Sequence, residues 1–483
     1  MKEQIAEKTL YACLCGYAAA EGDKRFLSDE EKSYSAAEVL ACVRGLASQL
    51  WARGVRAGSF VALEAARTKE AALLLYALQA VGAVAVLTDP RLPAAEFLRA
   101  SGTGVPAAYT LSSRRGAWEL FSAEGGAQEL TFSAGEALFA EGKDARAPAF
   151  IIFTSGSTGG AKAVVLSQAG MIVNSEDTLE RGRYIPEDVN IALVPLFHVF
   201  GLSLVITAAV ARHAVYFPTE TDIPSVLRDI RRHGVTRMNG VPSLYLMLAE
   251  EAEKAGASLP SLRTGLIGGG PCTAGQFAYI EEKLGMTLIP IYGMSECAGI
   301  SLADHRDSFA ERSGSVGRAY PLNRIHILGE GGEALPAGRE GEICVDSPFR
   351  MLGYYGAPAE AGPLHTGDLG VVDEKGFLHI TGRKKDIIIR NGNNVSAADI
   401  ERALLSLPYV RAAAAVGVAD ERCGEVPCAL VVLREEIGEA ALRASLSRLL
   451  KKHEMPERFL FAAALPLTPT GKPDKQKIKE MFA

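Results

Sequence analysis

The sequence predicts an α/β protein made of two doubly wound units, a small β-rich unit and a separate α+β domain at the C-terminal end. Three observations support this. Short apolar strands alternate with amphipathic helices to about residue 300, a rhythm typical of a mostly parallel sheet covered by helices. From 313 to 382 the strands are short and broken by glycine pairs. After Lys385 a new series of strands and helices begins.

The first unit opens with a strong helix signal. Ser35 and Glu38 have the spacing of a capping box, apolar residues follow at helical intervals to Leu50, and Gly54 is a stop. The segment 122–147 has few large apolar residues, so we expect a loose surface excursion before a strand at 149–153. Between Gly54 and the segment 122–147 we expect strands at 59–63, 83–88 and 105–111 and helices at 72–81 and 94–100.

The pattern of the last hundred residues predicts a separate small domain. We expect a strand after Lys385, a helix at 397–407, strands at 411–418 and 427–433, a helix at 439–451, and a final strand, loop and helix.

Composition excludes several classes of protein. At about 150 residues per domain, 483 residues suggest about three domain-sized units. Lys+Arg 51 against Asp+Glu 57 gives −6, which fits neither a disordered polyanion nor a basic nucleic-acid binder, so we expect no nucleic acid partner. The longest apolar run, 71–88, is interrupted by Gln79 and Gly82, so no membrane span is expected. Eight cysteines without a paired CxxC pattern predict free thiols in a reducing compartment, the cytoplasm.

A run of small and hydroxyl residues marks the first candidate site. Phe153-Thr-Ser-Gly-Ser-Thr-Gly-Gly-Ala-Lys162 follows an apolar strand and precedes a helical stretch at 167–174. Such a loop offers backbone N–H groups and hydroxyls to an anion, and Lys162 adds a positive charge, so we expect it to hold phosphates. The GxxxxGK[ST] spacing is absent, which disfavours an ordinary P-loop ATPase. The alternative interpretation is a flexible linker.

Two further loops follow apolar strands. Tyr292-Gly-Met-Ser-Glu-Cys297 comes after 287–291, and Leu266-Ile-Gly-Gly-Gly-Pro271 ends another strand. Ligands of open α/β sheets bind beyond the carboxyl ends of strands, so these loops and the first one are expected to converge. Tyr292 offers a face for a base and Glu296 a hard oxygen for Mg²⁺. Taken singly, each of these residues is better explained by a structural role than by ligand binding.

Two charged segments and a lysine complete the candidates. His365-Thr-Gly-Asp368 and Thr381-Gly-Arg-Lys-Lys-Asp386 flank a hairpin-like segment at 370–380. A carboxylate and a guanidinium can hold ribose hydroxyls, although a surface ion pair is the plainer alternative. Lys472 lies in a loop framed by proline and glycine.

These motifs, in this order and spacing, resemble the AMP-forming adenylating superfamily of acyl-CoA synthetases, adenylation domains and luciferases. The resemblance spans nearly the whole chain. It implies an N-terminal adenylation domain, 1–384, of two doubly wound subdomains plus a β-barrel, which holds ATP and the acyl pocket. A hinge joins it to a small mobile α+β domain, 385–483.

The resemblance also implies roles for individual residues. Glu296 would hold Mg²⁺, Tyr292 with Gly293 the adenine, and Asp368 with Arg383 the ribose. Lys472 would bridge the acyl carboxylate and the α-phosphate, Lys385 falls at the hinge, and Gly392 would line the pantetheine tunnel after the small domain rotates. His198 resembles the gate beside the acyl pocket, and Gly269 belongs to the loop that borders it. The β- and γ-phosphates would lie on Thr154, Ser155, Gly156, Ser157, Thr158, Gly159 and Lys162. This chain departs from the usual pattern at Ala161, Ala163 and Gln168.

The function that follows is ATP-dependent activation of a carboxylic acid, with release of pyrophosphate, and transfer of the acyl group to a thiol. The cofactors would be ATP, Mg²⁺ and coenzyme A, or phosphopantetheine on a carrier protein. The alternatives are an adenylation enzyme that loads an acyl or peptidyl carrier protein, a luciferase-like oxidase, and a non-catalytic nucleotide-binding protein. Val199 follows the gate histidine where amino-acid-activating relatives place an aspartate, so an α-amino acid is the less favoured substrate.

Overall fold

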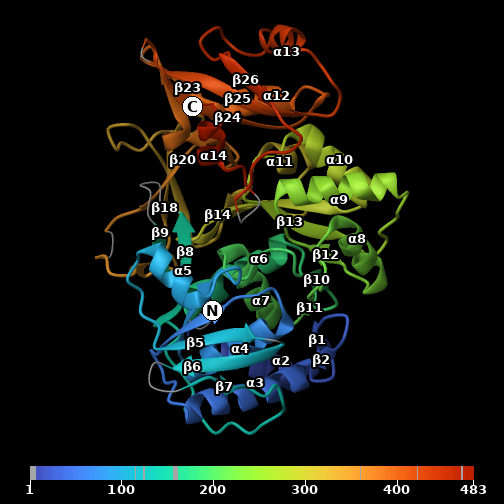
Figure 1. Cartoon of the computed structure of the whole chain (residues 1–483), viewed down its shortest axis with the longest axis vertical. Coiled ribbons are helices and arrows are strands. Elements are labelled where there is room, and N and C mark those ends of the chain that lie inside the picture. Colours follow the sequence, from blue (N-terminus) through green and yellow to red (C-terminus); the bar gives the residue numbers. More distant parts are fainter. Residues whose placement is uncertain are drawn as a thin grey trace.

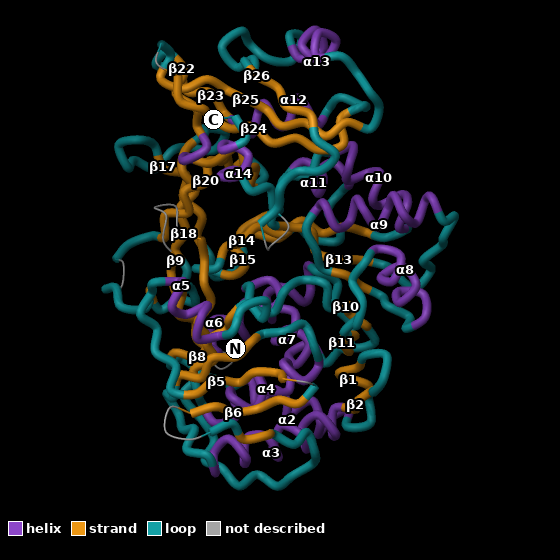
Figure 2. The backbone as a smooth tube through the Cα atoms, in the orientation of Figure 1, coloured by secondary structure: helices purple, strands orange, loops and turns teal. Residues whose placement is uncertain are grey.

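The computed structural model describes residues 7–114, 116–122, 126–155, 161–358, 361–420, 422–468 and 472–482 (Figure 1). Two large sheets and the helices around them form the N-terminal part, and a small sheet with its own helices forms the C-terminal end (Figures 1 and 2). No helix among these residues combines the length and the apolar character needed to cross a bilayer.

The first large sheet has eight strands in the order β19-β9-β8-β4-β3-β5-β6-β7. Its centre, β8-β4-β3-β5, is parallel, and antiparallel strands extend both edges. The excursion expected at 122–147 is a long connection, and the short strand β7 is the one element that lies wholly within its described part. The strands are β3 (Phe60–Glu64), β4 (Val84–Thr88), β5 (Tyr109–Arg114), β6 (Ala117–Ser122), β7 (Gln128–Glu129), β8 (Pro148–Ser155), β9 (Ala161–Ser167) and β19 (Gly353–Tyr354).

The second large sheet has nine strands in the order β16-β15-β14-β13-β12-β10-β11-β1-β2. The run from β14 to β1 is parallel, as a doubly wound unit requires. The strands are β1 (Arg25–Ser28), β2 (Ser33–Ser35), β10 (Val189–Ile191), β11 (Ala214–Tyr216), β12 (Arg237–Met238), β13 (Thr264–Gly268), β14 (Thr287–Met294), β15 (Ala298–Leu302) and β16 (Arg318–Ala319).

Helices cover both faces of each large sheet. One apolar core joins the two sheets through α2 (Leu10–Glu21), α3 (Ala36–Ala52), α4 (Lys69–Val81), α6 (Gln168–Arg181) and α7 (Val199–Ala211). The opposite face of the first sheet packs on α5 (Ala94–Ser101), and that of the second on α8 (Ile223–Arg232), α9 (Pro242–Lys254) and α10 (Ala274–Leu284). The capping box at Ser35 forms as predicted, with α3 ending just before Gly54.

The β-rich unit is a four-stranded antiparallel sheet in the order β17-β18-β20-β21. Among the described residues no pairing joins β17 to β21. Its strands are β17 (Arg324–Leu328), β18 (Gly341–Asp346), β20 (Leu364–Val372) and β21 (Leu378–Arg383), and α11 (Phe309–Gly314) precedes it.

The C-terminal end is an α+β unit with separate apolar cores on the two faces of its sheet. The helix expected to run to 451 ends at Leu446, because the Arg443 guanidinium donates to the carbonyls of Pro456 and Glu457 and the chain turns back toward β26. The elements are η1 (Lys384–Asp386), β22 (Ile387–Arg390), β23 (Asn393–Ser396), α12 (Ala397–Leu405), β24 (Val410–Asp420), β25 (Gly424–Leu433), α13 (Glu439–Leu446), β26 (Arg458–Phe461) and α14 (Lys475–Glu480).

Candidate active site

The glycine and hydroxyl loop lies at the tip of the β8–β9 hairpin. Thr154 pairs with Lys162 across the two strands, so both residues flank the loop. The helical stretch expected at 167–174 is confirmed as the start of α6, and the apolar run 161–167 forms β9 between the loop and that helix. Ser155 ends β8. The expected phosphate-binding residues Gly156, Ser157, Thr158 and Gly159 lie outside the described residues.

Glu296, the expected metal ligand, is buried and held by a tyrosine. The Tyr354 hydroxyl donates to Glu296 Oε1 at 2.8 Å, and Glu296 is 7% exposed. The Lys162 ammonium lies over the Tyr354 ring, 4.6 Å from its centroid. Tyr354 is in place because β19 pairs antiparallel with β9, opposite Val164. One tyrosine therefore contacts both the expected metal ligand and the expected phosphate-binding lysine.

Asp368 gathers the residues expected to hold the nucleoside. It is 5% exposed. Its Oδ2 accepts from the Tyr292 hydroxyl at 2.8 Å, and its Oδ1 lies 2.7 Å from Arg383 Nε. Asp368 and Arg383 are opposite one another in the β20–β21 hairpin. Burial and the Asp368 carboxylate raise the pKa of Tyr292, so its hydroxyl remains a donor at neutral pH.

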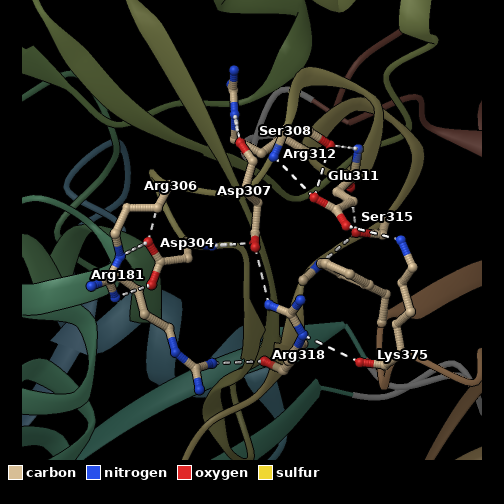
Figure 3. Close-up of polar contacts among 12 residues, drawn as sticks. Arg181, Asp304, Arg306, Asp307, Ser308, Glu311, Arg312, Ser315, Arg318 and Lys375 are labelled. Atoms are coloured by element: carbon tan, nitrogen blue, oxygen red, sulfur yellow. Dashed lines mark hydrogen bonds and ion pairs between the residues drawn. The ribbon is translucent and has the colours of Figure 1, made fainter.

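A polar network fixes the far end of the same hairpin (Figure 3). Arg318 Nη1 lies 3.0 Å from Asp307 Oδ1, and Arg318 Nε donates to the Lys375 carbonyl at 3.3 Å. Lys375 Nζ lies 3.3 Å from Glu311 Oε1. These contacts tie the β20–β21 turn to the segment between β15 and β16 of the second large sheet. The anchored hairpin therefore presents Asp368 to Tyr292 at the end of β14.

Lys472 of the small C-terminal unit reaches the edge of the second large sheet. A Cβ placed on Gly269, which has φ +82°, would lie 3.4 Å from Lys472 Cε and 3.3 Å from Val241 Cγ1. The lysine is held by its loop, where the Thr468 amide donates to the Lys472 carbonyl at 2.7 Å. Although part of the residue is exposed, surrounding protein atoms, followed by the charge of Arg383, hold the pKa of its ammonium below the usual value.

His198 begins α7 close to this lysine. Burial, then the positive charge of Lys472, lowers the pKa of His198 to about 4, so the ring is neutral at pH 7. Its Nε2 is buried and has no hydrogen-bond partner among the residues that the structure describes. The expected gate residue is thus an uncharged ring beside the tip of Lys472.

Ion pairs hold the small unit in this position. Arg411 Nη2 lies 2.7 Å from Glu250 Oε2, and Arg434 Nη1 lies 3.4 Å from Glu250 Oε1. Glu250 is on α9, whereas Arg411 is the second residue of β24 and Arg434 follows β25. These long-range pairs keep Lys472 over Gly269.

The contacts on the two sides of Lys385 lead to different units. Lys384 Nζ lies 2.8 Å from Glu342 on β18, whereas Asp386 Oδ2 lies 2.8 Å from Lys475 on α14. Lys385 itself is exposed. Gly392 lies at the exposed turn between β22 and β23, where Asn391 and Gly392 have φ of +51° and +74°. The structure thus brings Lys472 to the site while Gly392 occupies a separate, solvent-facing turn.

One other cluster could suggest a metal. Glu342, Cys344 and His365 place their ligand atoms within 4.8 Å of one another. The Lys384 ammonium already pairs with that carboxylate, and burial raises the pKa of the Cys344 thiol to about 11, which disfavours the thiolate that metals bind. We therefore assign no metal to it.

Sequence reasoning missed two features of the site. Tyr354 lies in a short strand without periodic pattern, and only its pairing with β9 brings it to Glu296. The contact of Glu250 with Arg411 joins residues 161 positions apart, and each looks like an ordinary surface charge in the sequence.

Comparison with known proteins identifies relatives over nearly the whole chain. Residues 16–355 match the profile of the AMP-binding enzyme family, and residues 399–472 match the AMP-binding enzyme C-terminal domain. A feruloyl-CoA synthase from Amycolatopsis sp is 32% identical over 461 residues, which is 92% of this chain and 93% of that protein. A sulfoacetate–CoA ligase from Cupriavidus necator is 35% identical over 343 residues, 69% of this chain and 67% of that protein.

Solved structures agree with the fold. ATP-bound MatB from Rhodopseudomonas palustris superimposes with a TM-score of 0.83 at 27% identity, covering 98% of both chains. The o-succinylbenzoate CoA synthetase of Bacillus subtilis with its acyl-adenylate intermediate gives a TM-score of 0.81 at 26% identity, again covering 98% of both chains. The same enzyme has also been solved with ATP and a magnesium ion.

Proposed function

Because this chain belongs to the AMP-binding enzyme family, we propose a reaction in two steps and assign its parts to the residues described above. The chain is an AMP-forming acid–thiol ligase. A carboxylate attacks the α-phosphorus of ATP, which forms an acyl-adenylate and releases pyrophosphate, and a thiol then displaces AMP. The observation that most supports this assignment is the position of Lys472 over Gly269, which follows β13, because the neighbouring strand β14 carries Tyr292, the partner of Asp368.

Charge explains what the first step requires. The attacking carboxylate and the α-phosphate are both anions, so their approach must be offset by positive charge. Lys472 would bridge them, a role supported by the position of its side chain next to Gly269. No general base is needed, since a carboxylic acid is already ionised at pH 7. The neutral His198 ring borders the acyl group without adding charge.

The residues around Glu296 fit Mg²⁺. Its carboxylate offers hard oxygen atoms, and the phosphates of ATP, which usually complete the shell of this ion, would lie beside Lys162. When bound, Mg²⁺ neutralises phosphate charge and helps pyrophosphate to leave. Thr154 and Lys162, which pair across β8 and β9, would flank the same phosphates.

Asp368 and Arg383 hold the ribose, and Tyr292 with Gly293 borders the adenine. Arg383 is half exposed and pairs with the buried carboxylate, so its guanidinium can turn toward a ligand while Asp368 stays fixed by Tyr292. The plainer interpretation, a surface ion pair, fits poorly with a carboxylate that is 5% exposed.

The second step needs a different arrangement of the small unit, 385–483. We place the hinge at Lys385, because the residues on either side of it are bound to different units. Rotation there would withdraw Lys472 and bring the turn at Gly392 to the site, where it would line the path of a pantetheine thiol. The acceptor that we favour is coenzyme A, as in the names of the relatives, and a carrier protein is the alternative. Eight free cysteines suit a cytoplasmic location.

Replacing Gly392 tests the second step. Gly392→Trp should slow thiol capture of a supplied acyl-adenylate by about 10²-fold, because the side chain blocks the thiol path. Pyrophosphate release in the first turnover should stay near wild type. The substrate is an acid chosen from a panel of short, medium and aryl acids by pyrophosphate release. Both steps are measured in single-turnover assays.

The matched control for that experiment is Gly392→Asn. Asparagine tolerates the positive φ of this turn but is far smaller than tryptophan. It should therefore retain most of the thiol step. Equal slowing of both steps by the tryptophan variant would contradict the assignment of this turn to the thiol path.

A further inference from the structure

Tyr354 lies between two groups of opposite charge. Its hydroxyl donates to Glu296 Oε1 at 2.8 Å, and its ring carries the Lys162 ammonium 4.6 Å from the centroid. In the described part of the chain no ion pair joins Lys162 directly to Glu296. The arrangement therefore keeps a cation and a buried carboxylate apart, although both belong to one site.

The hydroxyl has a second consequence for the carboxylate. A hydrogen bond to Oε1 orients the Glu296 side chain, and Oε2 accepts no hydrogen bond from the residues that the structure describes. Carboxylates that bind metals are oriented by such outer partners, whose loss typically weakens metal affinity by about 10- to 100-fold. The backbone holds the tyrosine itself in place, since β19 pairs with β9, the strand that carries Lys162.

The ring has a separate role. An aromatic face attracts a cation, but the ring has no net charge and so does not neutralise that cation. Without the ring, Lys162 would lose this attraction, and its ammonium could turn toward the Glu296 carboxylate instead of toward the phosphates.

We propose that Tyr354 is a positioning residue of the metal and phosphate site. Its hydroxyl orients Glu296 for the divalent cation, and its ring keeps Lys162 apart from that carboxylate and available to the phosphates. The inference rests on the proposed function and adds a division of labour between the two ends of one side chain.

The test separates the two ends with conservative and severe variants. Tyr354→Phe retains the ring and removes the hydroxyl, whereas Tyr354→Ala removes both. Tyr355→Phe is the matched control, because it removes a hydroxyl from the next residue, whose ring packs on Phe60 with centroids 5.7 Å apart. Binding of α,β-methylene-ATP is measured by calorimetry with EDTA, and binding of Mn²⁺ in the presence of that nucleotide is measured by electron paramagnetic resonance.

Tyr354→Phe should weaken Mn²⁺ binding by about 10-fold or more while metal-free nucleotide binding stays within about twofold of wild type. Tyr354→Ala should weaken both, and Tyr355→Phe neither. Thermal unfolding of each variant checks that it is folded. A Phe variant that binds Mn²⁺ like wild type, or that loses metal-free binding equally, would overturn the role of the hydroxyl. An Ala variant with the metal-free affinity of the Phe variant would overturn the role of the ring. Failure of wild type itself to bind the nucleotide would instead count against the proposed function.

Discussion

Lys472→Ala should reduce adenylate formation by about 10²- to 10³-fold, the loss expected when a donor aimed at transition-state charge is removed. The reason is position: Lys472 Cε lies 3.4 Å from where a Gly269 Cβ would be, in the place proposed above for the meeting of the acyl group and the nucleotide. Thiol capture of a supplied acyl-adenylate should remain within a few fold of wild type, because that step takes place after the lysine has withdrawn. Pyrophosphate release and thioester formation are measured separately.

The control for this variant is Lys477→Ala. Lys477 lies on α14 of the same unit, and its side chain is 64% exposed. Its ammonium lies 3.4 Å from the carboxylate of Asp474, three residues earlier. Both steps should survive its removal. Loss of both steps to the same extent in a folded Lys472→Ala protein would contradict the exchange of Lys472 and Gly392 at one site.

The second large effect is expected at Glu296. Glu296→Gln should lower ATP-dependent turnover by about 10²- to 10³-fold, because the amide cannot supply the negative charge that holds the metal, whose contribution is worth several kcal/mol. Glutamine retains the size of the side chain and an oxygen that can accept from Tyr354, so the fold should be preserved. The measurement is pyrophosphate release as a function of Mg²⁺ concentration.

Glu251→Gln is a suitable comparison for that experiment. This glutamate is on the surface of α9, 3.7 Å from Lys254 and outside the site, and its loss should change little. Activity of Glu296→Gln close to wild type at saturating Mg²⁺ would remove Glu296 from the metal site.

The sequence predicted the convergence of the site but not its internal contacts. Polar loops after apolar strands were enough to place Tyr292 and the loop at 266–271 at one edge, because parallel strands end together. The pairing of Asp368 with Arg383 followed from the hairpin between them. Both predictions depended on local patterns that the chain could not easily satisfy in another way.

Two parts of the fold depended on information that local pattern does not carry. The apolar run 161–167 suits a strand or a helix, and only pairing with β8 makes it β9. Tyr354 and Glu250 find their partners across 58 and 161 positions, through strand register and the docking of the small unit.

The nucleotide product tests the account most directly. The wild-type protein is incubated with ATP, Mg²⁺, coenzyme A and an acid from the panel, and the nucleotides are separated by chromatography while the thioester is quantified. Attack at the α-phosphorus predicts AMP and pyrophosphate, each formed in step with the thioester. ADP and phosphate as the products would place the attack at the γ-phosphorus and contradict the account.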